Sequence, residues 1–98
     1  STGRTPLQEA SFGGYLSIVR QLLNQSAPID DADKEGDAAI HLATRQGHKT
    51  VVQFLCQSGA SLDALNKQGE SPEMIAKTKG YDEIARVVAV FGSRRIST

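Results

Sequence analysis

This chain of 98 residues has little of what marks secreted, membrane or nucleic-acid-binding proteins. It has one cysteine, Cys56, which cannot form an intramolecular disulfide. No charged segment followed by an apolar one opens the sequence, so we expect an intracellular protein, cytoplasmic or nuclear. The longest apolar run, residues 84–91, is interrupted by Arg86 and is far shorter than the roughly 20 residues that cross a bilayer. We therefore expect no membrane contact.

Charge of a single sign is also missing. Eleven Lys and Arg residues balance eleven Asp and Glu residues, so the formal net charge is zero. A neutral chain has no long-range attraction for nucleic acid, and we expect no nucleic-acid partner. Hydrophobic residues at 39% and charged residues at 22% are typical of a folded globular protein, and the length suits a single domain.

Glycine, by contrast, recurs in an ordered pattern. The interval from Gly3 to Gly36 is 33 residues, and the interval from Gly36 to Gly69 is the same. A second series with this period consists of Gly14, Gly47 and Gly80. Between the two series lie TPLQEA at residues 5–10, AAIHLA at 38–43 and SPEMIA at 71–76. A fixed period of this length predicts a stack of repeated structural units.

The pattern resembles the ankyrin repeat, in which a glycine is followed by Thr-Pro-Leu-His-x-Ala, then Gly-His, an apolar helix and Gly-Ala. The resemblance covers about residues 3–90 and is fullest in the middle repeat. It implies an all-α solenoid of stacked helix–turn–helix units joined by β-hairpin-like loops. We expect one domain over residues 1–98, with repeats at about 3–35, 36–68 and 69–92, the third being a C-terminal cap, and a tail at 93–98.

Residue types mark where the helices of each repeat begin and end. Thr5 and Ser71 are suited to cap helix N-termini, and a proline follows each of them. Gln8 can complete a capping box with Thr5. The middle repeat has Ala38 at this position, and Asp37 is the substitute cap that we expect there. The second glycine series should end the first helices in the left-handed conformation.

The two ends of the predicted stack differ. Glu73 replaces an expected leucine in the third repeat, which gives that repeat the polar outer face of a cap. The first repeat keeps apolar stacking residues, including Leu7, Ile18 and Leu22, and so resembles an internal repeat. Our hypothesis is that further repeats precede this segment in a longer protein.

Chemical sites find little support in the sequence. Residues 31–36 resemble the start of an EF-hand calcium loop, but Leu42 stands where a bidentate glutamate is needed. His41 and His48 have no metal-ligand spacing with Cys56, and the resemblance assigns both histidines to bracing turns and adjacent repeats. Cys56 occupies an apolar helix position, where a thiol packs as a small hydrophobe. We expect no enzyme, no cofactor, no metal and no small-molecule substrate.

The C-terminal sequence Arg94-Arg95-Ile96-Ser97 resembles a basic kinase-recognition pattern with Ser97 as acceptor. Such tetrapeptides are common by chance, and we favour a frayed tail.

The resemblance also implies a protein or peptide partner. In the ankyrin family the ligand usually lies along the concave side, where it touches hairpin tips and the exposed ends of the first helices. Within one repeat, residues at these positions are not required for stacking, which leaves them free to encode a partner. Carried onto this sequence, the set that we call the concave strip is Arg4, Phe12, Lys34, Glu35, Asp37, Arg45, Gln46, Lys67, Gln68, Glu70, Thr78 and Lys79, with Thr2 and Gly13 beside it.

The competing interpretation of the strip is an ordinary solvated face, because most of its members are charged residues of both signs. Phe12 stands apart, since aromatic residues supply many interface hot spots. Alternatively, Phe12 packs under a missing upstream repeat or against Arg45. The sequence thus predicts a protein-interaction module of a larger protein, and the alternative is a structural spacer that positions a flanking catalytic domain of kinase or ubiquitin-ligase type.

Overall fold

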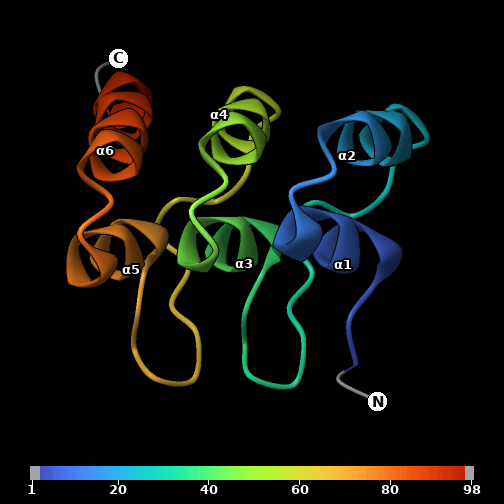
Figure 1. The fold of residues 1–98 in the computed structure, drawn as a ribbon, viewed down its shortest axis with the longest axis horizontal. Coiled ribbons are helices and arrows are strands. Elements are labelled where there is room, and N and C mark those ends of the chain that lie inside the picture. Colours follow the sequence, from blue (N-terminus) through green and yellow to red (C-terminus); the bar gives the residue numbers. More distant parts are fainter. Residues whose placement is uncertain (1–2, 97–98) are drawn as a thin grey trace.

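The computed structural model describes the backbone of residues 3–96 and the side chains of residues 3–93. Over this part of the chain, helices alternate with loops in three successive units (Figure 1). The first helices of the units form one row, the second helices form another row above it, and two long loops project below (Figure 1). This arrangement confirms the all-α stack. The helices are α1 (Pro6–Gly13), α2 (Leu16–Asn24), α3 (Ala39–Arg45), α4 (Lys49–Gln57), α5 (Pro72–Lys79) and α6 (Asp82–Ile96).

The predicted caps are confirmed in the first and third repeats. The Gln8 amide donates to Thr5 Oγ1 at 3.2 Å, and the Thr5 amide donates to Gln8 Oε1 at 2.8 Å, which completes the capping box. Ser71 Oγ accepts from the Met74 amide at 3.3 Å.

The expected cap of the middle repeat is wrong. The N-cap of α3 is Ala38, and its N–H donates to Nδ1 of His41 at 3.0 Å. The Asp37 carboxylate cannot serve as the cap because it is already bonded to Arg45 and Asn66. His41 thus supplies from inside the helix the acceptor that a capping side chain would otherwise provide.

The second glycine series ends the first helices as predicted. Gly14, Gly47 and Gly80 have φ angles of 76°, 76° and 77°, the left-handed conformation that reverses the chain. A side chain at Gly14 would also clash, because its Cβ would lie 2.6 Å from Nδ1 of His48 in the next repeat. Glycine therefore serves both the turn and the close approach of neighbouring units.

The core is densest in the middle repeat, which has a neighbour on each side. Every residue from 38 to 44 is buried, and so are Val51, Val52 and Leu55 in α4. Their apolar surface is covered by helices of all three repeats, as expected of a stack in which no unit has a complete core of its own. Among the described residues, no helix combines the length and apolar character needed to cross a membrane.

The first repeat departs from the expectation of fully apolar stacking positions. Leu7 is already covered within the chain and is 1% exposed, whereas Ile18 is 48% exposed. Glu9 is exposed at the position where the middle repeat buries Leu42 and the third buries Ile75. The outer face of this repeat is therefore mixed, and upstream repeats stay a prediction.

The C-terminal helix is longer than expected. α6 continues to Ile96, so Gly92 and Ser93 lie inside a helix and not in a frayed tail. Before it, Glu73 pairs with Lys77 at 3.1 Å on a partly exposed face, which agrees with a polar end. The proposed acceptor Ser97 and the strip neighbour Thr2 lie outside the described residues, as do the side chains of residues 94–96.

Candidate interaction surface

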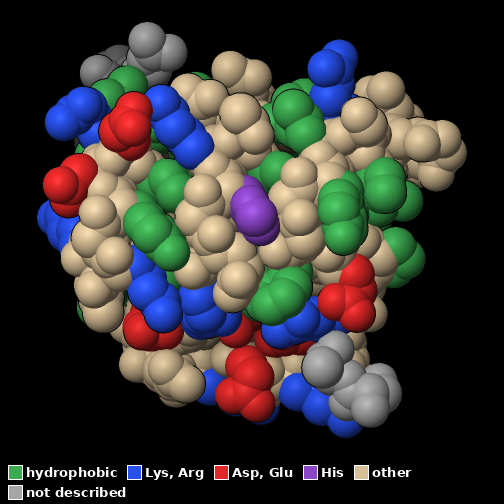
Figure 2. Space-filling model, in the orientation of Figure 1, with side chains coloured by type: hydrophobic (Ala, Val, Ile, Leu, Met, Phe, Trp, Pro, Cys, Tyr) green, Lys and Arg blue, Asp and Glu red, His purple; other side chains and the backbone are tan. Residues whose placement is uncertain are grey.

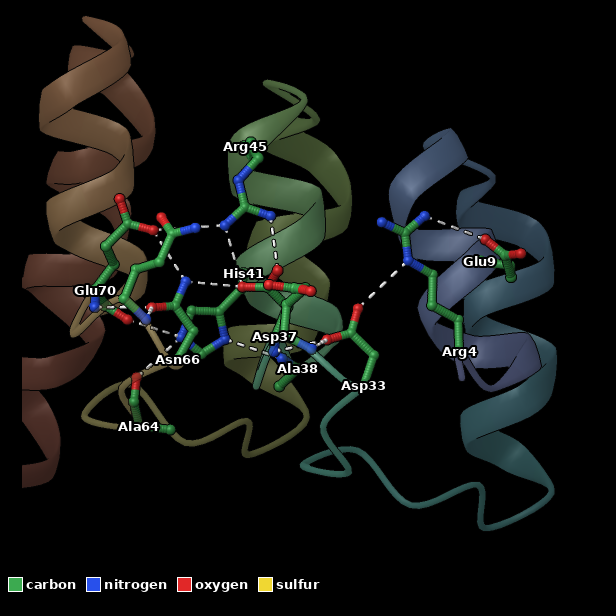
Figure 3. Close-up of polar contacts among 12 residues, drawn as sticks. Arg4, Glu9, Asp33, Asp37, Ala38, His41, Arg45, Ala64, Asn66 and Glu70 are labelled. Atoms are coloured by element: carbon green, nitrogen blue, oxygen red, sulfur yellow. Dashed lines mark hydrogen bonds and ion pairs between the residues drawn. The ribbon is translucent and has the colours of Figure 1, made fainter. Parts of the chain in front are cut away.

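The middle of the concave strip is a partly buried ion-pair network. The Arg45 guanidinium donates to both Asp37 oxygens, at 2.8 and 3.1 Å, and lies 3.6 Å from Oε1 of Glu70 (Figure 3). Nδ2 of Asn66 donates to both Asp37 and Glu70, each at 2.9 Å. Asp37 is 3% exposed and Asn66 6%. The network therefore joins the second and third repeats through Glu70, and Asp37 is a buried member of it, whereas the sequence led us to expect a surface residue.

The electrostatics of Asp37 follow from these contacts. Burial alone would raise the pKa of its carboxyl. Hydrogen bonds from Arg45 and Asn66, together with the charge of Arg45, outweigh burial and lower the pKa below its ordinary value of 3.8. Asp37 therefore stays ionised, and its carboxylate is bonded within the network.

Two residues that the sequence prediction overlooked shape the hairpin turns. Oδ1 of Asp33 accepts from the amides of Glu35 and Asp37, each at 2.9 Å. Oδ1 of Asn66 makes the equivalent pair of bonds with the second hairpin, at 3.0 and 2.9 Å. The available signal was an Asp or Asn at the same place in the 33-residue period, three residues before the turn glycine.

Arg4 plays the corresponding part in the first repeat. Its guanidinium lies over the Phe12 ring, 4.5 Å from the centroid, and its Nε donates to Oδ2 of Asp33 at 3.4 Å. A weaker ion pair joins Arg4 to Glu9 at 3.5 Å (Figure 3). Phe12 thus packs against Arg4, and packing under an upstream repeat or against Arg45 stays a prediction.

The histidines brace the repeats as the resemblance implied. His41 accepts from Ala38 through Nδ1, so its Nε2 carries the proton that faces the carbonyl oxygen of Ala64 at 2.9 Å. Gln8 makes the same pair of contacts in the first repeat, where Nε2 donates to the Asp31 carbonyl at 2.6 Å. Nε2 of His48 lies 2.9 Å from the Phe12 carbonyl oxygen in the preceding repeat. His48 therefore links neighbouring repeats, whereas Gln8 and His41 join the first helix of a repeat to the loop that follows it. Nε2 of His41 also lies 3.2 Å from the Glu70 carbonyl oxygen of the third repeat.

The remaining members of the strip point outward. Unlike the network residues, they are exposed. Asp33 and Asn66 fix the backbone of the hairpin turns that carry several of them. The Lys67 amide also donates to the Glu35 carbonyl oxygen at 3.0 Å and so joins the two hairpins. Figure 2 shows Lys and Arg side chains in a row across the lower half of this face, with acidic side chains beneath them. The exposed members are Lys34, Glu35, Gln46, Lys67, Gln68, Thr78 and Lys79.

Over the described residues, no group of three or more His, Cys, Asp and Glu side chains is placed to hold a metal ion. Cys56 is 2% exposed and packs in the core cluster, as predicted. The arrangement suits recognition by exposed side chains on a rigid support.

Comparisons with known proteins agree with the fold. A family model described as ankyrin repeats, in three copies, matches residues 7–94. The chain is also similar to the E3 ubiquitin-protein ligase mind-bomb of Drosophila melanogaster, with 39% identity over 41 residues. That match covers 42% of this chain and 3% of the ligase, so the chain spans only a small part of this relative's length.

Proposed function

Because the chain belongs to the ankyrin-repeat family, whose repeats generally serve as protein-interaction modules, we propose that it binds a partner protein or peptide along the concave strip. The site consists of exposed side chains at the hairpin tips and the first-helix ends. We place this activity in a larger intracellular protein, cytoplasmic or nuclear. The module itself is non-catalytic, as repeats of this family typically are.

The observation that carries the proposal is that the strip contains two kinds of residue, those that bond to other residues of the chain and those that are exposed. Arg45 bonds to Asp37 and pairs with Glu70, which joins the second repeat to the third. Exposed residues such as Lys34 and Lys67 stand on hairpins whose backbone this network and the turn bonds hold in place. A preorganised surface loses less conformational entropy on binding, which favours affinity.

The structure also decides which residues can test the proposal. Reversing the charge of Arg45 would place a third carboxylate beside Asp37 and Glu70, so loss of binding would be confounded with loss of folding. Lys34 and Lys67 are exposed, and neither forms an ion pair among the described residues. The double variant Lys34→Glu/Lys67→Glu is the appropriate probe.

The experiment begins with capture of a partner by cross-linking to the wild-type chain, followed by purification of that partner and titration. We expect the double variant to bind at least about tenfold more weakly, with an unchanged unfolding midpoint. The matched control is Arg20→Glu/Arg86→Glu, which makes the same charge change on exposed positions of α2 and α6. Because Arg20 lies over the Phe54 ring, 5.8 Å from its centroid, the unfolding midpoint of the control is measured as well, and its affinity is compared only if that midpoint is unchanged. Equal affinity for the strip variant, or equal losses for both variants, would refute the proposal.

A second candidate is a spacer that positions a flanking catalytic domain. The similarity to a small part of a ubiquitin ligase favours this candidate, because it compares the chain with a segment of a much longer enzyme. A spacer needs the stack but not the exposed strip. Activity of the parent protein that tolerates Lys34→Glu/Lys67→Glu but fails on unfolding of the repeats would favour the spacer.

A further inference from the structure

The second hairpin, residues 66–70, has an open edge. Its turn closes on itself, since the Asn66 amide donates to the Glu70 carbonyl oxygen and the Gly69 amide donates to the Asn66 carbonyl oxygen, each at 3.0 Å. The first hairpin, residues 33–37, lies on one side of it, and no described segment lies on the other side (Figure 1). Both hairpins project below the first helices, whereas the described end of α6 lies above them and does not cover this edge (Figure 1).

The contact between the two hairpins shows what such an edge binds. The Lys67 amide donates to the Glu35 carbonyl oxygen at 3.0 Å, and Nδ2 of Asn66 donates to Oδ1 of Asp37 at 2.9 Å. Backbone packs closely between these two bonds, because a Cβ on Gly36 would stand 2.8 Å from the Lys67 nitrogen. One hairpin therefore offers the next a backbone acceptor, a glycine surface and a carboxylate.

The second hairpin repeats the backbone acceptor and the glycine one period later, and neither is in use. Gln68 corresponds to Glu35, and no described residue donates a hydrogen bond to its carbonyl oxygen. Gly69 corresponds to Gly36 and has the same left-handed conformation, with φ of 77°, but a Cβ on it would meet no other residue within 4 Å. The outer side of this turn thus has room for another backbone segment.

The carboxylate is repeated as well, and Glu70 keeps an acceptor that Asp37 does not. Both oxygens of Asp37 are bonded to Arg45 of the same repeat, whereas the corresponding residue of the third repeat is Thr78. Oε1 of Glu70 meets Asn66 and Arg45, but no described residue donates to its Oε2. Because Arg45 already compensates the charge of Glu70, a neutral side-chain amide is the matching donor, as Asn66 is for Asp37.

Met74 gives this edge an apolar contact that the first hairpin lacks. At the corresponding position of the middle repeat, Nε2 of His41 lies 2.9 Å from the Ala64 carbonyl oxygen of the next loop. Met74 has no such donor, and it is 49% exposed. A segment lying beside the second hairpin therefore meets an apolar side chain at this point, which favours an apolar residue in the segment itself.

We propose that the open edge, defined as the outer side of residues 68–70 together with Met74, binds an extended segment of a partner protein. This inference rests on the proposed binding along the concave strip, to which Gln68 and Glu70 belong, and it names the partner's chemistry at one end of the strip. The segment carries an asparagine whose side-chain amide donates to Oε2 of Glu70. The residue after the asparagine donates its backbone N–H to the Gln68 carbonyl oxygen, and an apolar residue before the asparagine contacts Met74. In this mode of recognition main-chain bonds supply affinity and side chains supply specificity.

The test uses the whole chain, isotope-labelled for NMR and titrated to millimolar concentrations with acetyl-Ala-Leu-Asn-Lys-Gln-Gly-amide, the sequence of residues 64–69. We expect saturable shift changes centred on the amides of residues 68–70 and the methyl group of Met74. N-methylation of the peptide's lysine amide removes the donated N–H, and replacement of its asparagine by aspartate places a second carboxylate beside Glu70. Each change should weaken binding at least about fivefold.

A matched pair of protein variants tests the contribution of Met74. Met74→Asp should weaken peptide binding at least about threefold, because it removes the apolar contact, and an aspartate in the first turn of α5 suits the helix. Val90→Asp makes the same change at a similarly exposed position of α6 and should leave the affinity unchanged. Equal binding of the N-methylated peptide, equal effects of the two variants, or shifts spread over other surfaces would overturn the proposal.

Two further outcomes identify other occupants or other sites. Shift changes at the open edge on concentrating the protein alone would overturn the proposal, because a second copy would then fill the edge. Failure of this inference is also distinguishable from failure of the proposed function. A captured partner that is lost on Lys34→Glu/Lys67→Glu but is indifferent to Met74→Asp would leave binding at the strip in place and remove the open edge from it.

Discussion

Two nitrogens of the Arg45 guanidinium donate to the Asp37 carboxylate, eight residues earlier in the chain, and this pair joins the hairpin of the middle repeat to its first helix. The first repeat has the same relationship in a different chemistry, with the Arg4 guanidinium over the Phe12 ring. The same pair of positions in the repeat therefore forms an ion pair in one unit and a cation–π contact in another. Both contacts fix the strip from beneath.

Removing Asp37 should be costly. Asp37→Ala leaves the Arg45 guanidinium and the Asn66 amide without their buried partner, and we expect a loss of about 2–3 kcal/mol in the free energy of unfolding, since Arg45 retains some solvent. Urea denaturation measures this. The control is Lys49→Ala, which breaks the exposed pair with Glu83 and should leave the unfolding midpoint nearly unchanged. Similar losses in the two variants would contradict the role given to the network.

The same carboxylate predicts a pH dependence. The pKa of Asp37 in the folded chain is below its ordinary value of 3.8, so the folded state binds the proton less readily than the unfolded state does. The stabilisation is therefore fully present above about pH 5 and is lost as the pH falls through the folded-state pKa. Urea midpoints of wild type and Asp37→Asn should differ at neutral pH and converge below pH 3.8. A constant difference across this range would show that the carboxylate charge is not responsible.

Glutamine should replace His41 with little loss. Gln8 already makes the two contacts that His41 makes, accepting from an N-cap amide and facing a carbonyl in the next loop. We expect His41→Gln to cost under about 1 kcal/mol and His41→Leu to cost about 2–3 kcal/mol, because leucine leaves buried backbone groups unpaired. Thermal unfolding of the two variants compares them. Equal destabilisation would mean that the ring's shape, and not its hydrogen bonds, stabilises the turn.

Alanine substitutions at three glycines distinguish the cost of backbone strain from the cost of a steric clash. At Gly36, with φ of 78°, an added Cβ would stand 2.8 Å from the Lys67 backbone nitrogen, so Gly36→Ala should destabilise most. Gly69 has φ of 77° but open space around it, so Gly69→Ala should cost only the conformational penalty of about 1–2 kcal/mol. Gly92 is helical, and its Cβ would meet Leu62 at 3.9 Å, so Gly92→Ala should stabilise by about 0.5–1 kcal/mol. Denaturation midpoints in any other order would contradict this structure of the turns and of α6.

A buried hydroxyl offers a further test. Oγ1 of Thr44 is buried without a hydrogen-bond partner among the described residues, and Ser11 repeats this feature one period earlier. Thr44→Val keeps the shape and removes the unpaired polar atom, so we expect a gain of about 1 kcal/mol in the free energy of unfolding. A loss on this substitution would show that the hydroxyl has a partner.

The sequence was sufficient for features that depend on residue type at a fixed place in the period. Thr5 and Gln8 form their capping box within one helical turn, and the left-handed glycines need only their own backbone freedom. The role of Asp37 was not predictable in this way, because Asn66 stands 29 residues away and becomes its neighbour only after stacking. The C-terminal extent of α6 was misjudged, because Gly92 is helical although Gly59, at the same place in the period, lies in a turn. The strip residues were chosen by resemblance alone, and their use in binding stays a prediction.

The most direct test of the account is hydrogen–deuterium exchange of the chain with and without a captured and purified partner. The account predicts protection of the backbone at residues 33–37, 45–46, 67–70 and 78–79, with exchange in α2 and the outer turns of α4 unchanged. Protection confined to the second helices, with the hairpin tips unaffected, would contradict it.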